Sequence, residues 1–297
     1  MKYKTPAALE MAVKQAAKNS KQDTNRAISG FYFHRLLCRV FDGNSDEFVL
    51  KGGQGMLART IDARATRDID LLSMSDNLDD ALQSLRRMAE KNLDDFLYFE
   101  YVGSEPIKAS DEYRNGLSVK FVPILGIKRM QSISIDLVVD EIPLDEAERL
   151  TPVDRIDVAG LKTCNYLVYP VTTALADKFC ALHESHDGRP SSRVKDLVDI
   201  IIYATTCNID GVDLGRHLKR EISARKLEKV NHFALPDEWW SAHTKQYKKL
   251  VQQTGIASFF YDIDNASKLA STLFDPVLAG MCFSMFWDCE NMKWKNS

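Results

Sequence analysis

The chain has 297 residues and a net charge of −3, and its composition is 45% hydrophobic and 27% charged. This composition is typical of a soluble globular protein with enough chain for one large domain or two ordinary ones. The charge excludes a global attraction to nucleic acid, although it leaves room for a local basic face, and no apolar run reaches the length of a membrane span.

The cysteines and the N-terminus favour a cytoplasmic protein. The six cysteines are scattered along the chain, and no two of them form a C-x-x-C pair. Reduced thiols are therefore expected in preference to a disulfide framework or a zinc site. The first ten residues lack the apolar segment of a signal peptide. No membrane partner is expected.

The first 150 residues alternate between helical and strand-like patterns. Residues 5–40 are expected to form two helices, because Thr5-Pro6 and Asp23-Thr24-Asn25 are typical helix starts. Further helices are predicted over 55–63 and 78–92. Strands are predicted, from their β-branched and aromatic content, over 47–51, 68–72, 96–102, 117–122 and 132–139.

After Pro152 the pattern becomes mostly helical, apart from a short strand over 166–168. Helices are predicted over 171–185, 191–206, 212–227, 237–253 and, in pieces, 258–294, with Pro190, Pro236 and Pro276 separating them. The chain is therefore expected to be an α+β protein. Its expected division is a core domain over 1–160, which includes the N-terminal helices, and a helical domain over 161–297.

The most informative segment joins a glycine turn to a pair of acids. An apolar strand runs into Gly52-Gly53, and Asp68 and Asp70 then flank Ile69. Residues i and i+2 of a strand project from the same face, so the two carboxylates would point together. Converging carboxylates are costly unless a cation such as Mg²⁺ neutralises them, and paired glycines let backbone N–H groups approach an anion. The segment predicts a nucleoside triphosphate held by a metal.

A third acid, Asp136, alternates with apolar residues in the strand expected over 132–139. A lone acid in such a strand needs a partner, which could be an arginine, a backbone donor or the metal predicted at Asp68 and Asp70. The metal interpretation is favoured. Asp140 is expected to end the strand in a turn.

The helical half contains a lysine and two acids of interest. Lys178 lies at the border of the apolar stripe of its helix, where it could reach into a cleft or remain a surface lysine. Asp196 and Asp199 share one side of the next helix, and Arg193 and Lys195 could pair with them or contact phosphates. For Arg193 and Asp199, a salt-bridged structural helix is favoured.

Two other patterns have simpler interpretations. Asp262-Ile263-Asp264 repeats the D-x-D spelling, but its helical spacing makes the two acids diverge, so metal binding is not expected there. Basic residues are dense over 216–225, which includes Arg216, Lys219, Arg220 and Arg225, and over 245–249. Each stretch could form a phosphate-contacting face or an ordinary solvated helix face.

The chain resembles the polymerase-beta type of nucleotidyltransferase, and more narrowly the AbiEii family of toxin nucleotidyltransferases from type IV toxin–antitoxin systems. The resemblance covers roughly residues 45–280 and follows an ordered set of motifs: Lys51-Gly52-Gly53, Arg64-x-Thr66-x-Asp68-Ile69-Asp70, Ile135-Asp136, Asp177-Lys178, Arg193-x-Lys195-Asp196-Leu197-x-Asp199 and the ending Leu273-Phe274-Asp275-Pro276-Val277.

The resemblance implies a mixed-sheet nucleotidyltransferase core, and a helical lobe that completes the nucleotide cleft. It implies that Asp68, Asp70 and Asp136 bind Mg²⁺, in a two-ion site, and are catalytic together with Lys178 and Asp196. Asp136 would complete the metal site or activate the attacking hydroxyl. The residues that it places at the nucleoside triphosphate are Lys51, Gly52, Gly53, Arg64, Thr66 and Lys178. After the glycines this chain has Gln54-Gly55-Met56 in place of the family's Thr-Ala-Leu, so Gln54 has no assigned role.

The activity implied is transfer of a nucleoside monophosphate from a triphosphate to an acceptor hydroxyl, with release of pyrophosphate. The acceptor would be the 3′ end of tRNA, and the cognate antitoxin would be a transcriptional regulator. Three alternatives remain open: nucleotidylation of a protein hydroxyl, a non-catalytic module that binds a nucleotide or a partner, and metal-dependent hydrolysis by a phosphatase or nuclease. The intact acids argue against the second, and the glycine turn argues against the third.

Overall fold

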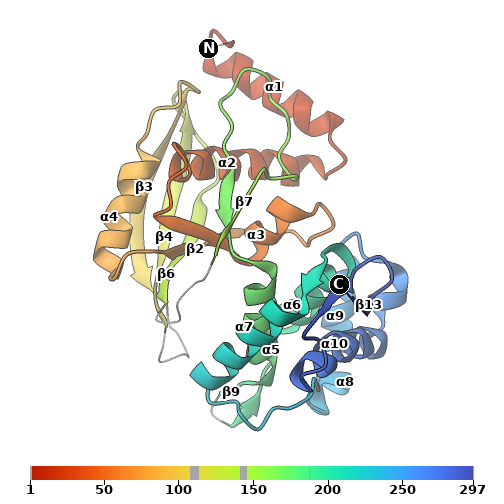
Figure 1. Ribbon diagram of the computed structural model, residues 1–297. Helices are drawn as coiled ribbons and strands as arrows, with labels where there is room; N and C mark the ends of the chain where they lie inside the picture. The colour runs from red at the N-terminus through yellow and green to blue at the C-terminus, as the bar shows by residue number, and fades with distance from the viewer. Residues whose placement is uncertain (1, 108–113, 141–145, 187, 297) are drawn as a thin grey trace. The chain divides into compact units, whose positions relative to one another are not determined.

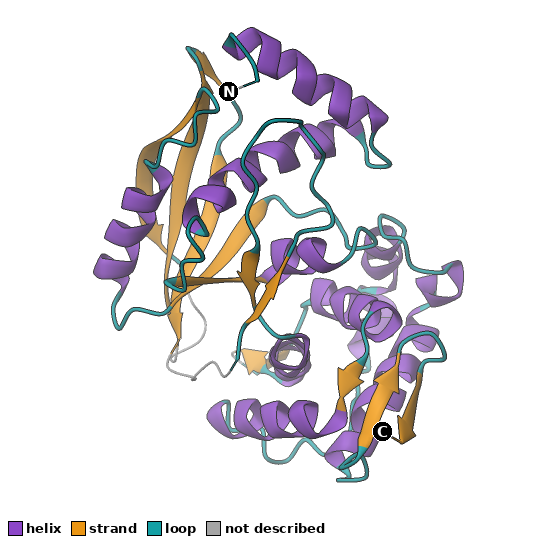
Figure 2. Ribbon diagram, turned by 45° about the horizontal axis from the view of Figure 1, so that its top comes forward, coloured by secondary structure: helices purple, strands orange, loops and turns teal. Residues whose placement is uncertain are grey.

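The computed structural model describes residues 2–107, 114–140, 146–186 and 188–296. It divides into two compact units. The N-terminal unit contains Met1–Ile61 and Ala65–Tyr169, and the C-terminal unit contains Asp62–Arg64 and Pro170–Ser297. The units change at Tyr169, whereas the sequence predicted a division after residue 160. Figure 2 shows a large sheet together with helices in the N-terminal unit, and mainly helices with a few short strands in the C-terminal unit.

A mixed sheet is the centre of the N-terminal unit. Its strand order is β3-β4-β6-β2-β1-β8-β7, with β5 paired to β4. The strands are β1 (Phe48–Lys51), β2 (Asp68–Ser73), β3 (Leu97–Pro106), β4 (Arg114–Leu125), β5 (Lys128–Arg129), β6 (Ile133–Asp140), β7 (Glu148–Leu150) and β8 (Tyr166–Val168). β2 runs parallel to β6 and antiparallel to β1. The turn expected at Asp140 falls on residues 141–145, outside the described residues.

The helices of this unit are α1 (Pro6–Asn19), α2 (Thr24–Val40), α3 (Gly52–Arg59) and α4 (Leu78–Ala89) (Figure 1). The predicted starts of α1 and α2 are confirmed, because the Thr5 and Asp23 side chains accept hydrogen bonds from the first turn of each helix. Apolar side chains of α1, α2 and α4 form one core with the sheet. Each fully buried aliphatic or aromatic side chain contributes about 1.5–3 kcal/mol to folding.

The C-terminal unit is mostly helical. Its elements are α5 (Val171–His183), β9 (Ser185–His186), β10 (Arg189–Pro190), α6 (Val194–Thr206), β11 (Ile209–Asp210), α7 (Gly211–Ala224), α8 (Glu238–Ala242), α9 (Thr244–Val251), the 3₁₀ helix η1 (Ser258–Tyr261), α10 (Ile263–Leu278), β12 (Met285–Asp288) and β13 (Lys293–Asn296). No helix among the described residues combines the length and the apolar character needed to cross a membrane.

The prediction of helix up to residue 294 is wrong at its end. β12 and β13 form an antiparallel hairpin that extends β11, and within it Trp287 lies opposite Trp294. Trp287 is fully buried, and its indole N–H donates to the Ala204 carbonyl. Local periodicity does not predict such a long-range contact. Pro276 does not interrupt its helix as predicted, because α10 continues through it to Leu278.

Candidate functional site

The sheet brings the three predicted acids together. Asp70 on β2 lies directly opposite Asp136 on the parallel strand β6. Asp68 precedes Asp70 by two residues and therefore projects from the same face of the sheet. All three side chains are half-buried, whereas Ile69 between the first two is fully buried in the core. The strand alternation inferred from the sequence is thus confirmed, and one face of β2 and β6 carries the acids.

The electrostatics of this face are those of like charges held close together. Burial and the negative charge of Asp68 raise the pKa of Asp136 above its usual value, and a hydrogen bond with Ser118 opposes that shift. Ser118 lies opposite Asp136 on β4. Thr66 orients the first acid, because its hydroxyl donates to Asp68 Oδ1 at 2.5 Å. A cation placed among these groups would relieve their repulsion.

The double glycine allows the turn after β1 to lie against these acids. Gly52 has φ +61°, and a Cβ at this position would lie 1.8 Å from Asp70 Oδ2. A Cβ on Gly53 would lie 3.0 Å from the Thr66 Cβ. Gly52 therefore combines a left-handed backbone with a close approach that a side chain would prevent.

α3 begins at Gly52, three residues before the predicted start at residue 55, so both glycines belong to its first turn. The N–H groups of a helix's first turn have no partners within the helix, and they attract anions. Lys51 precedes them, with its Nζ 5.0 Å from the centre of the Tyr169 ring. The helix ends at Arg59, earlier than the predicted residue 63. Residues 62–64 instead belong to the C-terminal unit.

The donor chemistry of the face fits a hard divalent cation, because carboxylate oxygens are the ligands that Mg²⁺ prefers. The described residues nevertheless contain no group of three or more His, Cys, Asp or Glu side chains arranged to hold a metal ion together. Metal binding by the three acids therefore stays a prediction.

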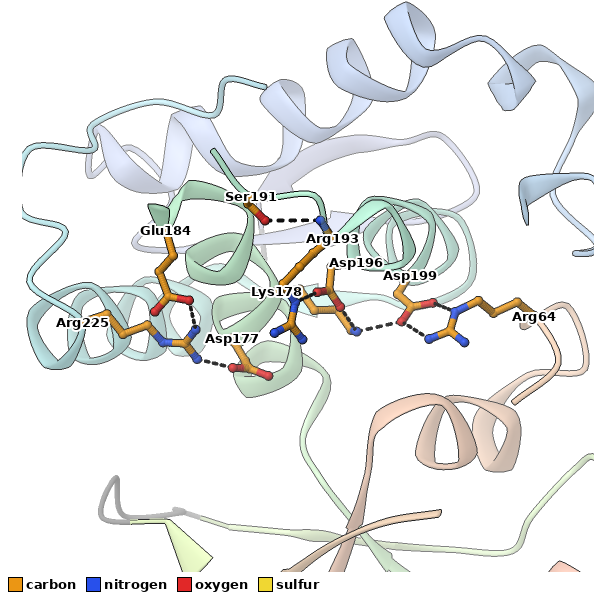
Figure 3. A network of polar contacts seen from close by, with 9 residues as sticks. All are labelled: Arg64, Asp177, Lys178, Glu184, Ser191, Arg193, Asp196, Asp199 and Arg225. Atoms are coloured by element: carbon orange, nitrogen blue, oxygen red, sulfur yellow. Dashed lines mark hydrogen bonds and ion pairs between the residues drawn. The ribbon is translucent and has the colours of Figure 1, made fainter. Parts of the chain in front are cut away.

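The predicted residues of the helical half form a separate buried network (Figure 3). Lys178 Nζ on α5 donates to Asp196 at 2.8 Å and to Asp199 at 2.7 Å, both on α6. Arg64 donates to both oxygens of Asp199, at 2.9 and 3.1 Å. Arg193 Nε donates to Asp196 Oδ2 at 2.6 Å. The network neutralises the two aspartates with cations from three segments of the chain.

This network corrects several expectations. Lys178 is only 8% exposed, so the surface-lysine alternative is wrong. Burial alone would lower its pKa, but the charges of Asp196 and Asp199 raise it well above its usual value. Burial alone would raise the pKa of Asp196, but Lys178 and Arg193 lower it. The predicted pairing of Arg193 is confirmed, whereas Asp199 pairs with Arg64 and Lys178 and not with Arg193 or Lys195.

The basic stretch over 216–225 is not one continuous face. The Arg225 side chain is 1% exposed and forms ion pairs with Asp177, Glu184 and Glu221. The alternative in which Arg225 contacts phosphate is therefore wrong. In the other stretch, Lys245, Lys248 and Lys249 are exposed on either side of the buried Tyr247. Asp262 of the second D-x-D precedes α10 and caps it by accepting from the backbone N–H groups of Asp264 and Asn265, whereas the sequence predicted that both acids lie within a helical segment.

One polar cluster was missed by the sequence reasoning. Asp154, in the loop between β7 and β8, is bonded by Gln54 of α3 and lies 3.2 Å from His34 of α2. These residues are buried at 8%, 1% and 2% exposure. The departure from the family pattern at Gln54 was the only signal in the sequence, and it did not indicate the partner 100 residues away.

Comparison with known families gives one match over most of the chain. The family model described as the nucleotidyl transferase AbiEii toxin of type IV toxin–antitoxin systems matches residues 35–266. That range contains every site residue predicted from the sequence. No curated protein matches the chain.

Solved structures include similar folds. MenT4, the nucleotidyltransferase toxin Rv2826c from Mycobacterium tuberculosis H37Rv, is 14% identical, with 92% of this chain and 98% of that chain covered and a TM-score of 0.50. JHP933 from Helicobacter pylori is 13% identical, with 88% and 94% covered and a TM-score of 0.44. The likeness to MenT4 is one of fold, and it confirms the predicted mixed α and β fold.

Proposed function

Because the chain belongs to the AbiEii family of nucleotidyltransferase toxins, we propose that it transfers a nucleoside monophosphate from a triphosphate to the 3′ end of tRNA, using Mg²⁺. The chain is a nucleotidyltransferase by family. The acceptor, the metal and the roles of individual residues are the proposal. The carrying observation is the packing of Gly52 against Asp70 beside Asp136, which puts an anion-binding helix start and a set of acids at one place.

Each group has a role that its surroundings support. The N–H groups of Gly52 and Gly53 would bind the triphosphate, and Thr66 would hold Asp68 in position. Asp68, Asp70 and Asp136 would hold the divalent cation, which supplies positive charge to the transferring phosphoryl group when bound. Asp136, with its raised pKa, would alternatively accept the proton of the attacking hydroxyl.

The role of Lys178 is more constrained than the motif alone suggests. Its ammonium already donates to two carboxylates, so it would reach a phosphate only by giving up one of them. Asp196 would then keep Arg193 as its partner. We propose that Lys178 first holds α5 and α6 together and contacts phosphate only in such an exchange.

The proposed toxin role implies a cognate antitoxin, which would be a transcriptional regulator encoded with this chain. Co-expression with the neighbouring small reading frame should restore growth that this chain alone arrests. Growth arrest by the Asp68→Asn variant would show instead that toxicity does not depend on transfer.

The proposal is tested with triphosphates that carry a radioactive α-phosphate, incubated with total RNA and Mg²⁺. Label should appear on RNA of tRNA size and be lost when the metal is chelated. Label on protein would instead identify a protein acceptor, and labelled nucleoside mono- or diphosphate would identify a hydrolase. Absence of all three products would contradict an active enzyme.

Asp68→Asn should reduce transfer by about 10²–10³-fold, since it removes a fixed charge at the reacting group. The matched control is Asp264→Asn, which changes the second D-x-D of the chain. Transfer by that variant should stay within about twofold of wild type, because Asp264 lies in the first turn of α10, where its carboxylate accepts a hydrogen bond from Trp240. Full activity of Asp68→Asn would contradict the proposal that Asp68 is a catalytic acid.

A further inference from the structure

The sheet face that carries the three acids continues beyond them onto β4. Ser134 on β6 lies opposite Asp68 of β2 on one side and opposite Lys120 of β4 on the other. Residues that lie opposite each other in paired strands project from the same side of a sheet. Asp68, Ser134 and Lys120 therefore form one row across three strands, which is called the lysine row below.

A second row runs beside the lysine row and has a different outer end. It contains Asp70, Asp136 and Ser118 on the same three strands, and Glu105 on β3 lies opposite Ser118. Glu105 is exposed, as is Lys120. The outer end of the second row is thus negative, whereas that of the lysine row is positive. A phosphate that approaches over β4 is therefore expected along the lysine row.

The lysine row lies on the side of the sheet that α1, α2 and α4 do not cover. The residues that alternate with it are Ile69, Ile135, Val119 and Phe121, and all four are buried in the core that these helices form with the sheet. Lys120 lies between two of them in sequence and is exposed. Its side chain therefore points away from the core, where a ligand can reach its ammonium group.

The surroundings of Lys120 leave its charge available. The described residues give its ammonium no ion pair, whereas Lys128 on the neighbouring strand β5 pairs with Glu10 at 2.6 Å. Gly103 lies opposite Lys120 on β3, and a Cβ at Gly103 would meet nothing within 4 Å. The lysine therefore borders open space next to a row that leads to Asp68.

The glycine turn sets the side from which an acceptor would arrive. Lys51, which leads into Gly52, lies opposite Asp70, so the proposed triphosphate site is on the β1 side of the acids. In phosphoryl transfer the attacking and leaving oxygens lie roughly in line with the phosphorus between them. With pyrophosphate leaving toward β1, the attacking hydroxyl would come from the opposite side, over β6 and β4. Lys120 lies on that side.

We propose that Lys120 binds a backbone phosphate of the acceptor RNA and thereby positions the terminal hydroxyl of that RNA at Asp136. The proposal rests on the proposed function for the place of the triphosphate and for the acceptor. Neighbouring strands lie about 4.8 Å apart, so the Cα atoms of Lys120 and Asp68 are roughly 10 Å apart. The flexible lysine stem shortens the distance from its ammonium to the acids. Ser134, which lies between them, can donate its hydroxyl to the same phosphate.

The chemistry of the row favours RNA over a protein as the acceptor. Lysine ammonium and serine hydroxyl groups are typical contacts of nucleic-acid phosphates. An RNA strand carries a phosphate next to its terminal nucleoside whatever its sequence, so one fixed cation can hold any RNA end. A protein acceptor does not regularly carry a negative charge at that position.

The test measures RNA binding without turnover. Asp68→Asn protein is titrated into a fluorescent single-stranded RNA oligonucleotide, and the anisotropy is recorded over a range of salt concentrations. Adding Lys120→Gln should raise the Kd about fivefold at about 0.1 M salt and lower the slope of log Kd against log salt by about 0.7, the value for one phosphate contact on a single strand. Lys120→Arg should keep both values, because a cation remains.

Lys128→Gln is the matched control. Lys128 is also exposed, but its charge is already paired with Glu10, so the Kd should change less than about twofold. Neither lysine contributes to the core, and thermal unfolding of each variant checks that it folds. A Kd that Lys120→Gln leaves unchanged, or that both variants raise equally, would overturn the proposal.

Steady-state transfer by otherwise wild-type enzyme separates this proposal from the proposed function. Lys120→Gln should lower kcat/KM for RNA about fivefold and leave KM for the triphosphate within about twofold. A raised KM for the triphosphate alone would overturn the proposal, since Lys120 would then serve the donor. RNA binding that depends on Lys120, in a chain that transfers nothing to RNA, would refute the proposed function and keep the phosphate site. Transfer to RNA that is unaffected by Lys120→Gln would do the reverse.

Discussion

Two sets of aspartates in this protein have opposite surroundings. On β2 and β6, Asp136 faces the like charge of Asp68, and its pKa is raised. On α6, Asp196 faces Lys178 and Arg193, and its pKa is lowered although burial opposes this. In the first set two carboxylates repel each other, which a bound cation would relieve, and in the second set cations of the same chain neutralise the acids. Acids of one residue type therefore indicate chemistry in one unit and mainly cohesion in the other.

The comparison predicts its largest effect at Asp199, which is fully buried between Arg64 and Lys178. Asp199→Asn should lower the free energy of unfolding of the C-terminal unit by about 3–5 kcal/mol, because it leaves buried cations without their counter-charge. Urea unfolding followed by tryptophan fluorescence measures this directly. All four tryptophans, Trp239, Trp240, Trp287 and Trp294, lie in that unit.

Asp213→Asn is the matched control in the same unit. Asp213 pairs with Arg216 at 2.9 Å, but the two side chains are 49% and 55% exposed. Solvent screening limits such a pair to about 1 kcal/mol or less. If Asp199→Asn proved as mild as this control, the description of the α6 acids as a cohesive network would be wrong.

A second, smaller effect is expected at Gly52. Gly52→Ala places a Cβ against Asp70 Oδ2 in addition to a left-handed backbone, which costs about 1–2 kcal/mol for a non-glycine residue. The displaced Asp70 should reduce nucleotide transfer at least tenfold. Gly43→Ala shares the backbone strain, with φ +72°, but its Cβ meets nothing within 4 Å. Equal transfer by the two variants would show that the approach of Gly52 to Asp70 has no catalytic value.

The smallest predicted effect is the pH dependence of thermal stability. The charged form of an aspartate should lower stability in the first set and raise it in the second. A raised pKa in the folded state means that the charged form of Asp136 destabilises folding as pH rises above the usual aspartate range. Asp136→Asn should therefore raise Tm at neutral pH. The change should be about 2 °C, because a half-exposed carboxylate is partly screened and is expected to contribute less than about 1 kcal/mol.

For Asp196 the pKa is lowered, so its charged form stabilises the folded state. Its stabilising contribution is present above the usual aspartate pKa and is lost as pH falls through the lowered value. Asp196→Asn should then lower Tm at neutral pH, with a difference that shrinks toward acid. Differential scanning fluorimetry from pH 3 to 8 compares both variants with wild type. Shifts of the same sign in both would erase the distinction between the sets.

Local patterns predicted much of the site. The alternation around Ile69 correctly put Asp68 and Asp70 on one face of their strand, and the alternation around Ile135 singled out Asp136, because a strand has a side-chain period of two. The helical periodicity placed Lys178 at the border of the buried face of α5 and put Asp196 and Asp199 on one side of α6, but it did not predict that the lysine contacts these acids. The C-terminal hairpin was missed because β12 and β13 are short and are stabilised by a distant contact of Trp287 with Ala204.

The sequence by itself determined which residues are candidates for the chemistry, since strand and helix periods, the glycine turn and the ordered motifs are local properties. Only the tertiary structure decided which of them meet. Pairing of β2 with β6 set Asp70 beside Asp136. Arg64 forms an ion pair with Asp199, which lies 135 residues later in the sequence. Gln54 likewise donates a hydrogen bond to Asp154, which lies 100 residues later in the sequence. Such contacts depend on how distant segments pack in the folded chain, and no local pattern records that packing.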